Sequence, residues 1–182
     1  MQRRPALIGL LIVATVILGA MLAPAIAPYP PTKMHPRERL QGPSNRHWLG
    51  TDESGRDLFS RIVYGARISV IAAAASSALA LAAGIPLGLV AGYRGGRTDD
   101  VLMRILDGFL AVPPILLALT LLAALGPSLI NVILAVGALG VPLTARITRA
   151  SVIVERERDY TLAARAIGAT DQYIMWRILL PN

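Results

Sequence analysis

Four long apolar stretches dominate the pattern of hydrophobic and polar positions along this chain. They run over residues 6–27, 68–92, 101–125 and 129–145. An α-helix of about 20 apolar residues crosses a hydrocarbon core of about 30 Å, because each residue adds about 1.5 Å. A lipid-exposed backbone must satisfy its own hydrogen bonds, so each stretch is predicted to be helical. The pattern therefore predicts an all-α, polytopic transmembrane helical bundle with four spans.

The first stretch fits two interpretations. Arg3 and Arg4 precede an apolar run that is followed by Ala-rich sequence, which is the order found in a secretory signal peptide. The run is longer than the apolar core of a typical signal peptide. Its length favours an uncleaved first span.

Glycine recurs every four residues in the second stretch, at Gly84, Gly88 and Gly92. Residues at this spacing lie on one face of a helix, and the missing side chains let another helix approach closely. The spacing predicts helix packing in preference to a role in solute binding.

Composition and charge agree with a membrane protein. Hydrophobic residues make up 54% of the chain, charged residues 16%, and the mean hydropathy is +0.57. Most of the 18 basic residues lie at inner ends of the spans if the N-terminus is cytoplasmic, and residues 29–67 are then external. The net charge of +7 is explained by this topology and by contacts with lipid head groups, so no nucleic-acid partner is predicted. The absence of cysteine excludes disulfides and thiolate metal sites.

The last part of the chain, residues 160–182, is too polar to span a bilayer and too apolar for a tail. Thr170 can cap a helix that starts at Asp171 and precedes Pro181. The helix-forming residues before Gly168 place four apolar side chains near one face, Leu162, Ala163, Ala166 and Ile167. The pattern predicts a helix–turn–helix hairpin on the cytoplasmic side. A generic interfacial hairpin and a docking element for another protein both fit it.

This hairpin sequence, AARAIGATDQYIMWRILLPN, resembles the EAA loop of bacterial ABC importer permeases. That loop has Glu-Ala-Ala, a Gly four residues after the second Ala, and Leu-Pro near its end. Ala163, Ala164, Gly168 and Pro181 match the pattern, whereas Leu162 stands in place of the Glu. HWLGTDESGRDLFSRIVYGARIS, YRGG, VPPILLAL and LGPSLINVILAVG are similar to the dipeptide, oligopeptide and nickel branch, specifically its DppC/OppC-like subunit. The resemblance extends over residues 6–182.

The resemblance implies a fold and a division of the chain. The fold is that of a type I ABC importer permease (MetI-like), in which a complete subunit has six spans, against four predicted here. Residues 1–67 would form an OppC-like N-terminal region with the first span and the external segment. Residues 68–182 would form an incomplete permease domain with the EAA-like loop at 159–182. A truncated gene product and a fragment of a longer protein would look alike.

The resemblance also implies partners and a mechanism. The loop docks in a cleft of a cytoplasmic ATPase, and the residues expected to make this contact are Ala163, Ala164, Gly168, Ala169, Thr170 and Pro181. The implied partners are two ABC ATPase subunits, a homologous permease subunit, an extracytoplasmic solute-binding protein and membrane lipids. The implied cargo is a dipeptide, an oligopeptide or a related small solute such as nickel.

No nucleotide site is expected in the chain itself. It lacks the G-x-x-x-x-G-K-[ST] motif that cradles phosphates, and its one lysine, Lys33, lies in the external segment. The sequence predicts neither enzymatic activity nor a cofactor, and ATP is expected to bind to a partner subunit. His35 and His47 have no second ligand at metal-binding spacing and are expected to be solvated, so no metal site is predicted.

The external segment is predicted to end in an amphipathic helix that leads into the second span. Thr51 or Asp52 can cap this helix, and the pairs Asp52–Arg56 and Asp57–Arg61 have the spacing of exposed ion pairs. Support of the helix bundle is the favoured role, and docking of a solute-binding protein is the alternative.

The third stretch carries charges and a proline pair. Arg104 and Asp107 lie three residues apart and are predicted to pair on one helix face. Pro113 and Pro114 predict a kink, because proline removes a backbone donor. Structural packing is the main expectation for this region, and a gating hinge is the alternative.

Two further classes of function fit parts of the pattern. A membrane scaffold or receptor anchor could use the hairpin to bind a partner that is not an ATPase. An ion-coupled secondary transporter is disfavoured, because no mid-span acidic residue is suited to carrying protons or sodium.

Overall fold

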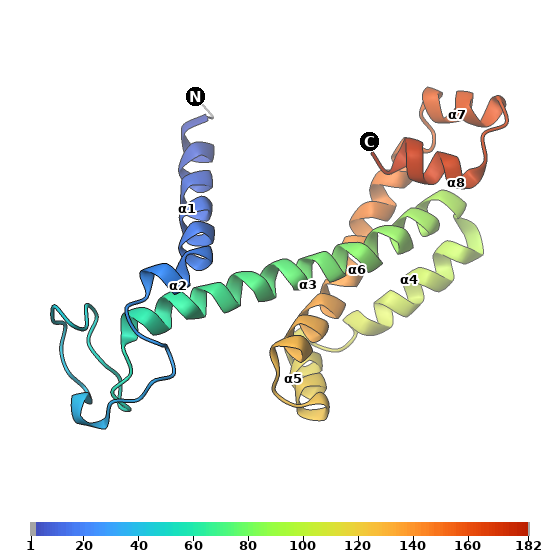
Figure 1. The fold of residues 1–182 in the computed structure, drawn as a ribbon. Helices are drawn as coiled ribbons and strands as arrows, with labels where there is room; N and C mark the ends of the chain where they lie inside the picture. The colour runs from blue at the N-terminus through green and yellow to red at the C-terminus, as the bar shows by residue number, and fades with distance from the viewer. Residues whose placement is uncertain (1–2, 182) are drawn as a thin grey trace. The chain divides into compact units, whose positions relative to one another are not determined.

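The computed structural model describes residues 3–181, and the elements within that range are helical (Figure 1). In chain order they are α1 (Arg3–Met21), α2 (Ala23–Ile26), the 3₁₀ turn η1 (Pro36–Glu38), α3 (Leu58–Arg94), α4 (Gly96–Leu110), α5 (Pro114–Leu125), α6 (Leu129–Glu155), α7 (Asp159–Ala166), α8 (Asp171–Tyr173) and the π-helical η2 (Ile174–Leu179). This confirms the all-α prediction for the described range. Backbone contacts divide the chain into two compact units, with the boundary inside α3 between Ala73 and Ala74.

Two helices, α3 and α6, are long and apolar enough to cross a membrane. α4 and α5 together form a third candidate, but they are bent by 79° at the break between them. The first apolar stretch is divided between α1 and α2, and the apolar helix Pro5–Met21 is shorter than α3 and α6. The described residues support two spans, or three if the bent pair counts as one. A total of four spans stays a prediction.

The third apolar stretch is broken rather than kinked. α4 ends at Leu110, and α5 begins at Pro114 and lies beside α6 (Figure 1). Pro113 has a ψ of 127°, the extended backbone that a residue before proline prefers. Neither proline can donate an amide to the preceding turn. The two consecutive prolines therefore end one helix and start another.

Two ion pairs hold α4 against α6. Asp107 pairs with Arg146 of α6, so the predicted pairing of this carboxylate with Arg104 is wrong. Asp99 is 9% exposed, and its two carboxylate oxygens accept hydrogen bonds from two nitrogens of Arg149. Sequence spacing did not indicate either pair, because the partners lie 39 and 50 positions apart.

Within the second unit, glycines let α3 and α6 approach closely. A Cβ atom added at Gly84, Gly88 or Gly92 would lie 2.6, 2.3 or 2.9 Å from the nearest α6 atom. Gly137 and Gly140 of α6 meet α3 side chains in the same way, at 2.6 and 2.7 Å. Real Cβ atoms do not come this close to other heavy atoms. The close packing predicted from the glycine spacing is confirmed.

Within the first unit, α3 starts later than predicted, because Asp57 caps it instead of Thr51 or Asp52. One Asp57 oxygen accepts a hydrogen bond from the amide of Ser60 at 2.7 Å, which is N-cap geometry. The other lies 2.9 Å from Nδ1 of His47, and both side chains are buried. Burial alone would raise the pKa of Asp57, but hydrogen bonds from Ser60 and His47 outweigh it and hold the pKa below its ordinary value. His47 is thus buried, contrary to the solvated state predicted.

Asp52 closes a turn before this cap. Its carboxylate accepts the amides of Ser54 and Arg56 at 2.8 and 2.9 Å, and the Arg56 amide is the main reason that the pKa of Asp52 falls to about 2. The predicted ion pair between Asp52 and Arg56 is confirmed at 2.8 Å. Arg61 also pairs with Asp52, so the predicted Asp57–Arg61 pair is wrong.

Candidate functional site

The candidate site is the hairpin formed by residues 159–181, which follows α6 (Figure 1). Gly168 ends α7 with a φ of 83°, a left-handed conformation that strains any residue with a side chain. The amide of Gly168 donates to the carbonyl of Arg165, and the amide of Ala169 donates to that of Ala164, both at 3.0 Å. This is the Schellman arrangement, which satisfies the last carbonyls of a helix. Gly168 therefore turns the chain sharply into the second limb.

The second helical part of the hairpin, α8 followed by η2, begins at the residue that the sequence predicted. The hydroxyl of Thr170 accepts a hydrogen bond from the amide of Tyr173 at 3.3 Å, and α8 starts at Asp171. η2 continues directly from α8, and the amide of Leu180 donates to the carbonyl of Met175 at 3.0 Å. The predicted helix–turn–helix hairpin is confirmed.

The hairpin buries one face against the ends of α3 and α6. Its buried residues are Thr161 and Ala164 from α7 and Ile174, Met175 and Leu179 from η2. Leu89 and Tyr93 of α3 and Val152 of α6 complete this apolar cluster. The opposite face of α7 is exposed and carries Leu162, Ala163, Ala166 and Ile167, which we call the α7 ridge. Ile167 is 86% exposed.

The residues expected to contact a partner fall on different sides of the hairpin. Ala163, Gly168, Thr170 and Pro181 are exposed and Ala169 is half-buried. Ala164 is only 9% exposed, which corrects its expected place on the docking surface, because it packs inside the hairpin. Leu162 of α7 and Ile167, the residue that caps its C-terminus, carry large exposed apolar side chains. Sequence reasoning placed these two on one face but did not select them as contacts.

Polar contacts fasten the hairpin to both long helices. The hydroxyl of Tyr93 in α3 donates a hydrogen bond to Oδ1 of Asp171 at 2.7 Å. The guanidinium carbon of Arg165 lies 5.6 Å from the centre of the Tyr93 ring. The hydroxyl of Thr161 donates to the carbonyl of Glu155, the last residue of α6, at 2.9 Å. No sequence signal indicated the Tyr93 contacts, because Asp171 lies 78 positions away.

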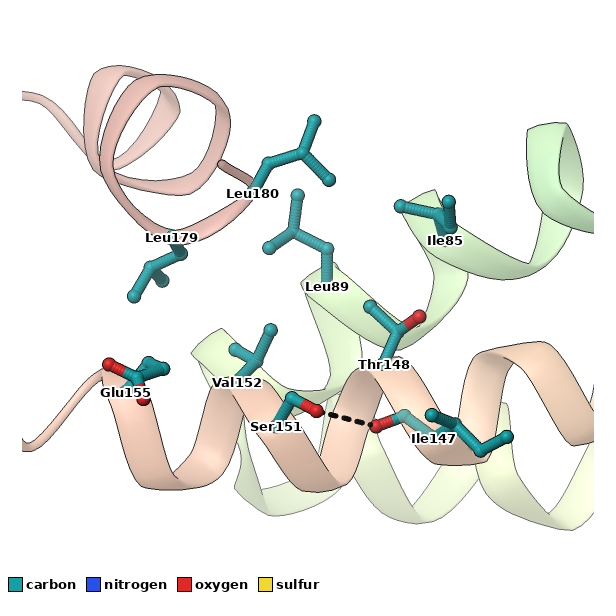
Figure 2. Close-up of a pocket in the computed structure, with 9 residues that line it drawn as sticks. All are labelled: Ile85, Leu89, Ile147, Thr148, Ser151, Val152, Glu155, Leu179 and Leu180. Carbon is teal, nitrogen blue, oxygen red and sulfur yellow. Dashed lines mark hydrogen bonds between the residues drawn. The ribbon is translucent and has the colours of Figure 1, made fainter. Parts of the chain in front are cut away.

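A hollow of about 250 Å³ lies between η2, α3 and α6 (Figure 2). Leu179, the last residue of η2, and Leu180, which follows it, line the hollow together with Leu89 of α3 and Val152 of α6 (Figure 2). The Ser151 hydroxyl that lines it donates to a carbonyl of its own helix at 3.2 Å. Across residues 3–181, no group of three His, Cys, Asp or Glu side chains could hold a metal ion. Most of the side chains that line the hollow are apolar.

The comparisons with known proteins decide the family. The family model for binding-protein-dependent transport system inner membrane components matches residues 84–182, more than half of the chain. The chain belongs to this family. A second model, the N-terminal TM domain of oligopeptide transport permease C, matches residues 1–43 of this permease. The predicted resemblance to ABC importer permeases is confirmed.

This permease also resembles curated proteins along its whole length. It is 44% identical to the dipeptide transport system permease protein DppC of Alkalihalophilus pseudofirmus, 42% to the di/tripeptide transport system permease protein DppC of Pseudomonas aeruginosa and 41% to the dipeptide transport system permease protein DppC of Haemophilus influenzae. The matches cover 100% of this chain and 60%, 62% and 63% of those proteins. The chain thus spans about three fifths of the length of these relatives.

Family membership settles the general class of this permease. Its relatives are transport permeases, which are not enzymes. Together with the apolar helices, the family makes the chain a multi-pass inner membrane protein.

Proposed function

We propose that the chain is a transmembrane permease subunit of an ATP-driven importer that moves peptides across the cytoplasmic membrane. The names of its relatives support peptides as the cargo, since they are dipeptide, di/tripeptide and glutathione transport permeases. Related small solutes such as nickel are the alternative cargo. Two ATPase subunits, which bind the ATP, a homologous permease and an extracytoplasmic solute-binding protein complete the importer.

The observation that carries this proposal is the exposed α7 ridge on an anchored hairpin. Ile167 and Leu162 are 86% and 43% exposed, although they belong to a segment whose other face is packed on α3 and α6. Burying such a side chain against a partner contributes about 1.5–3 kcal/mol to the free energy of binding. An apolar ridge beside polar and basic residues is the surface that a cleft in a cytoplasmic ATPase would cover.

The orientation that places the hairpin in the cytoplasm follows from charge. Arginines gather in and around the hairpin, at Arg156, Arg158, Arg165 and Arg177. Positive residues next to spans stay on the cytoplasmic side. With the four predicted spans, the N-terminus is then cytoplasmic as well, and the segment 28–57 is external.

The α4–α5 break is the proposed gating element. Pro113 and Pro114 separate the two helices, and the ion pair of Asp107 with Arg146 lies before the break. Charges are costly at membrane depth, so they mark pathways or partner contacts. Opening and closing of the importer would change the bend at the prolines. Arg104 lies on the same helix as Asp107 and belongs to this proposed element.

Replacing Ile167 with Glu tests the docking surface. We expect the ATPase subunits to bind on the order of 10- to 100-fold more weakly, because a buried apolar contact is exchanged for a charge. Association is measured by titrating purified ATPase subunits against the assembled permeases, together with dipeptide uptake. Gln172→Glu is the matched control, because it adds the same charge to an exposed position of α8.

Two results would contradict the proposal. Unchanged ATPase association and uptake for Ile167→Glu would remove the α7 ridge as the docking surface. Recovery of a partner without ATPase activity on the wild-type ridge would favour the scaffold or receptor-anchor alternative.

A further inference from the structure

Tyr93 lies in the last turn of α3 and contacts both limbs of the hairpin. Its side chain is 8% exposed. Its hydroxyl donates to Asp171, the first residue of α8, at 2.7 Å. Arg165, in the last turn of α7, places its guanidinium carbon 5.6 Å from the centre of the Tyr93 ring. One side chain of α3 thus holds the helices on either side of the turn at Gly168.

Both contacts are directional, whereas the packing around them is apolar. Leu89, Val152, Ile174 and Met175 form the apolar surroundings. The hydrophobic effect is non-directional, so apolar packing restrains the orientation of one surface on another less strictly than a hydrogen bond does. A hydrogen bond weakens steeply when its angle changes, and a cation over a ring depends on its position above the ring face. Tyr93 therefore sets the orientation of the hairpin relative to α3.

The end of α3 that carries Tyr93 packs closely on α6. Gly88 and Gly92 bring the two backbones together, and the side chain of Arg156, which follows α6, donates a hydrogen bond to the carbonyl of Gly92 at 2.8 Å. A displacement of the hairpin that is transmitted to Tyr93 is therefore passed to α3 and α6 together. Without the Tyr93 contacts, these two polar links between the hairpin and α3 are lost, while the Thr161 hydroxyl still holds the hairpin to the end of α6.

We propose that Tyr93 is the positioning residue that transmits movement of the hairpin to the membrane helices. This inference rests on the proposed docking of ATPase subunits on the α7 ridge. The ridge lies on the face of α7 opposite the buried one, so loss of the Tyr93 hydroxyl leaves docking intact. The ATPases then still bind and hydrolyse ATP, while the hairpin moves without carrying α3.

The experiment measures labelled dialanine transported per ATP hydrolysed, with the full-length permease assembled with its partner subunits in proteoliposomes. Tyr93→Phe keeps the ring under Arg165 and removes only the hydroxyl. We expect the transport ratio to fall about tenfold, the effect on an equilibrium of losing a hydrogen bond to a charged group. ATPase association is expected to stay at the wild-type level. Asp171→Ala should give the same loss, and the double variant should be no worse than either single variant.

Tyr160→Phe is the matched control. The Tyr160 hydroxyl, at the start of the hairpin, donates a hydrogen bond to Glu155, the last residue of α6, so its loss removes the same chemical group without affecting a contact with α3. This variant is expected to keep the wild-type ratio of transport to hydrolysis.

Three results would overturn the inference and leave the proposed function in place. The first is a wild-type ratio of transport to ATP hydrolysis for Tyr93→Phe. The second is a fall in this ratio for Tyr160→Phe as large as that for Tyr93→Phe. The third is a lower amount of assembled complex with an unchanged ratio per complex, which would give Tyr93 a structural role only. A wild-type permease that neither binds ATPase subunits nor takes up dialanine would overturn the proposed function, and this inference with it.

Discussion

At the scale of single residues, Gly88 decides how closely α3 can pack on α6. A Cβ atom at this position would lie 2.3 Å from the carbonyl oxygen of Ala145, which is backbone and cannot rotate away. Gly65 belongs to the same helix, but a Cβ atom there meets nothing within 4 Å. Two glycines of one helix thus have opposite roles, since one maintains a contact and the other only reduces helix propensity.

Replacing Gly88 with Ala is expected to destabilise the folded protein by about 1–3 kcal/mol, because the added methyl group forces the two helix backbones apart. Gly65→Ala is the control and should be neutral or stabilise by up to about 1 kcal/mol, since alanine is the better helix former. Thermal unfolding in detergent measures both variants. Equal stability of Gly88→Ala and wild type would show that the close approach of α3 and α6 is not maintained in the membrane protein.

At the scale of elements, the break between α4 and α5 shows how local chemistry divides an apolar stretch. The prolines remove two consecutive amide donors, and the extended Pro113 redirects the chain by 79°. On the α4 side, the pairs Asp99–Arg149 and Asp107–Arg146 hold the helix along α6. The bend therefore has two physical supports, one local and one tertiary.

Replacing both Pro113 and Pro114 with Ala tests the local support. We expect the bend to open, because two restored amides can continue the hydrogen bonding of α4 into α5. Spin labels on cysteines at the exposed positions Val101 and Leu119 report the distance between the helices, and no native cysteine interferes. Pro86→Ala, inside α3, is the control and should leave this distance unchanged. An unchanged distance in the double variant would assign the bend to tertiary packing alone.

At the scale of the whole molecule, function depends on which side of the membrane each exposed segment occupies. The segment 28–57 has its own interior, in which Asp57 and His47 are buried together. The hairpin exposes the α7 ridge, which is the proposed docking surface. The importer proposal requires these two segments to lie on opposite sides of the membrane.

Thiol labelling in intact cells tests this arrangement. A membrane-impermeant maleimide should label Asn45→Cys in the segment 28–57 and should leave Gln172→Cys in the hairpin unlabelled until the membrane is opened. Both positions are exposed, so protection reports the membrane and not burial. The reverse pattern would contradict the proposed orientation and the docking of a cytoplasmic ATPase.

The sequence by itself determined features that depend on neighbours along the chain. The helical class, the glycine packing face, the cap at Thr170 and the turn at Gly168 follow from periodicity, backbone freedom and local hydrogen bonding. The same reasoning placed the α7 ridge on one face, although it could not show that Ala164 lies outside that exposed face.

Only the tertiary structure decided which distant groups meet. Asp107 pairs with Arg146 instead of Arg104, Asp57 binds His47 instead of Arg61, and Tyr93 reaches Asp171 across 78 positions. The physical reason is that spacing limits which neighbours can share a helix face, whereas long-range partners depend on how helices pack. In this chain that packing is set by glycine contacts, proline breaks and buried polar pairs acting together.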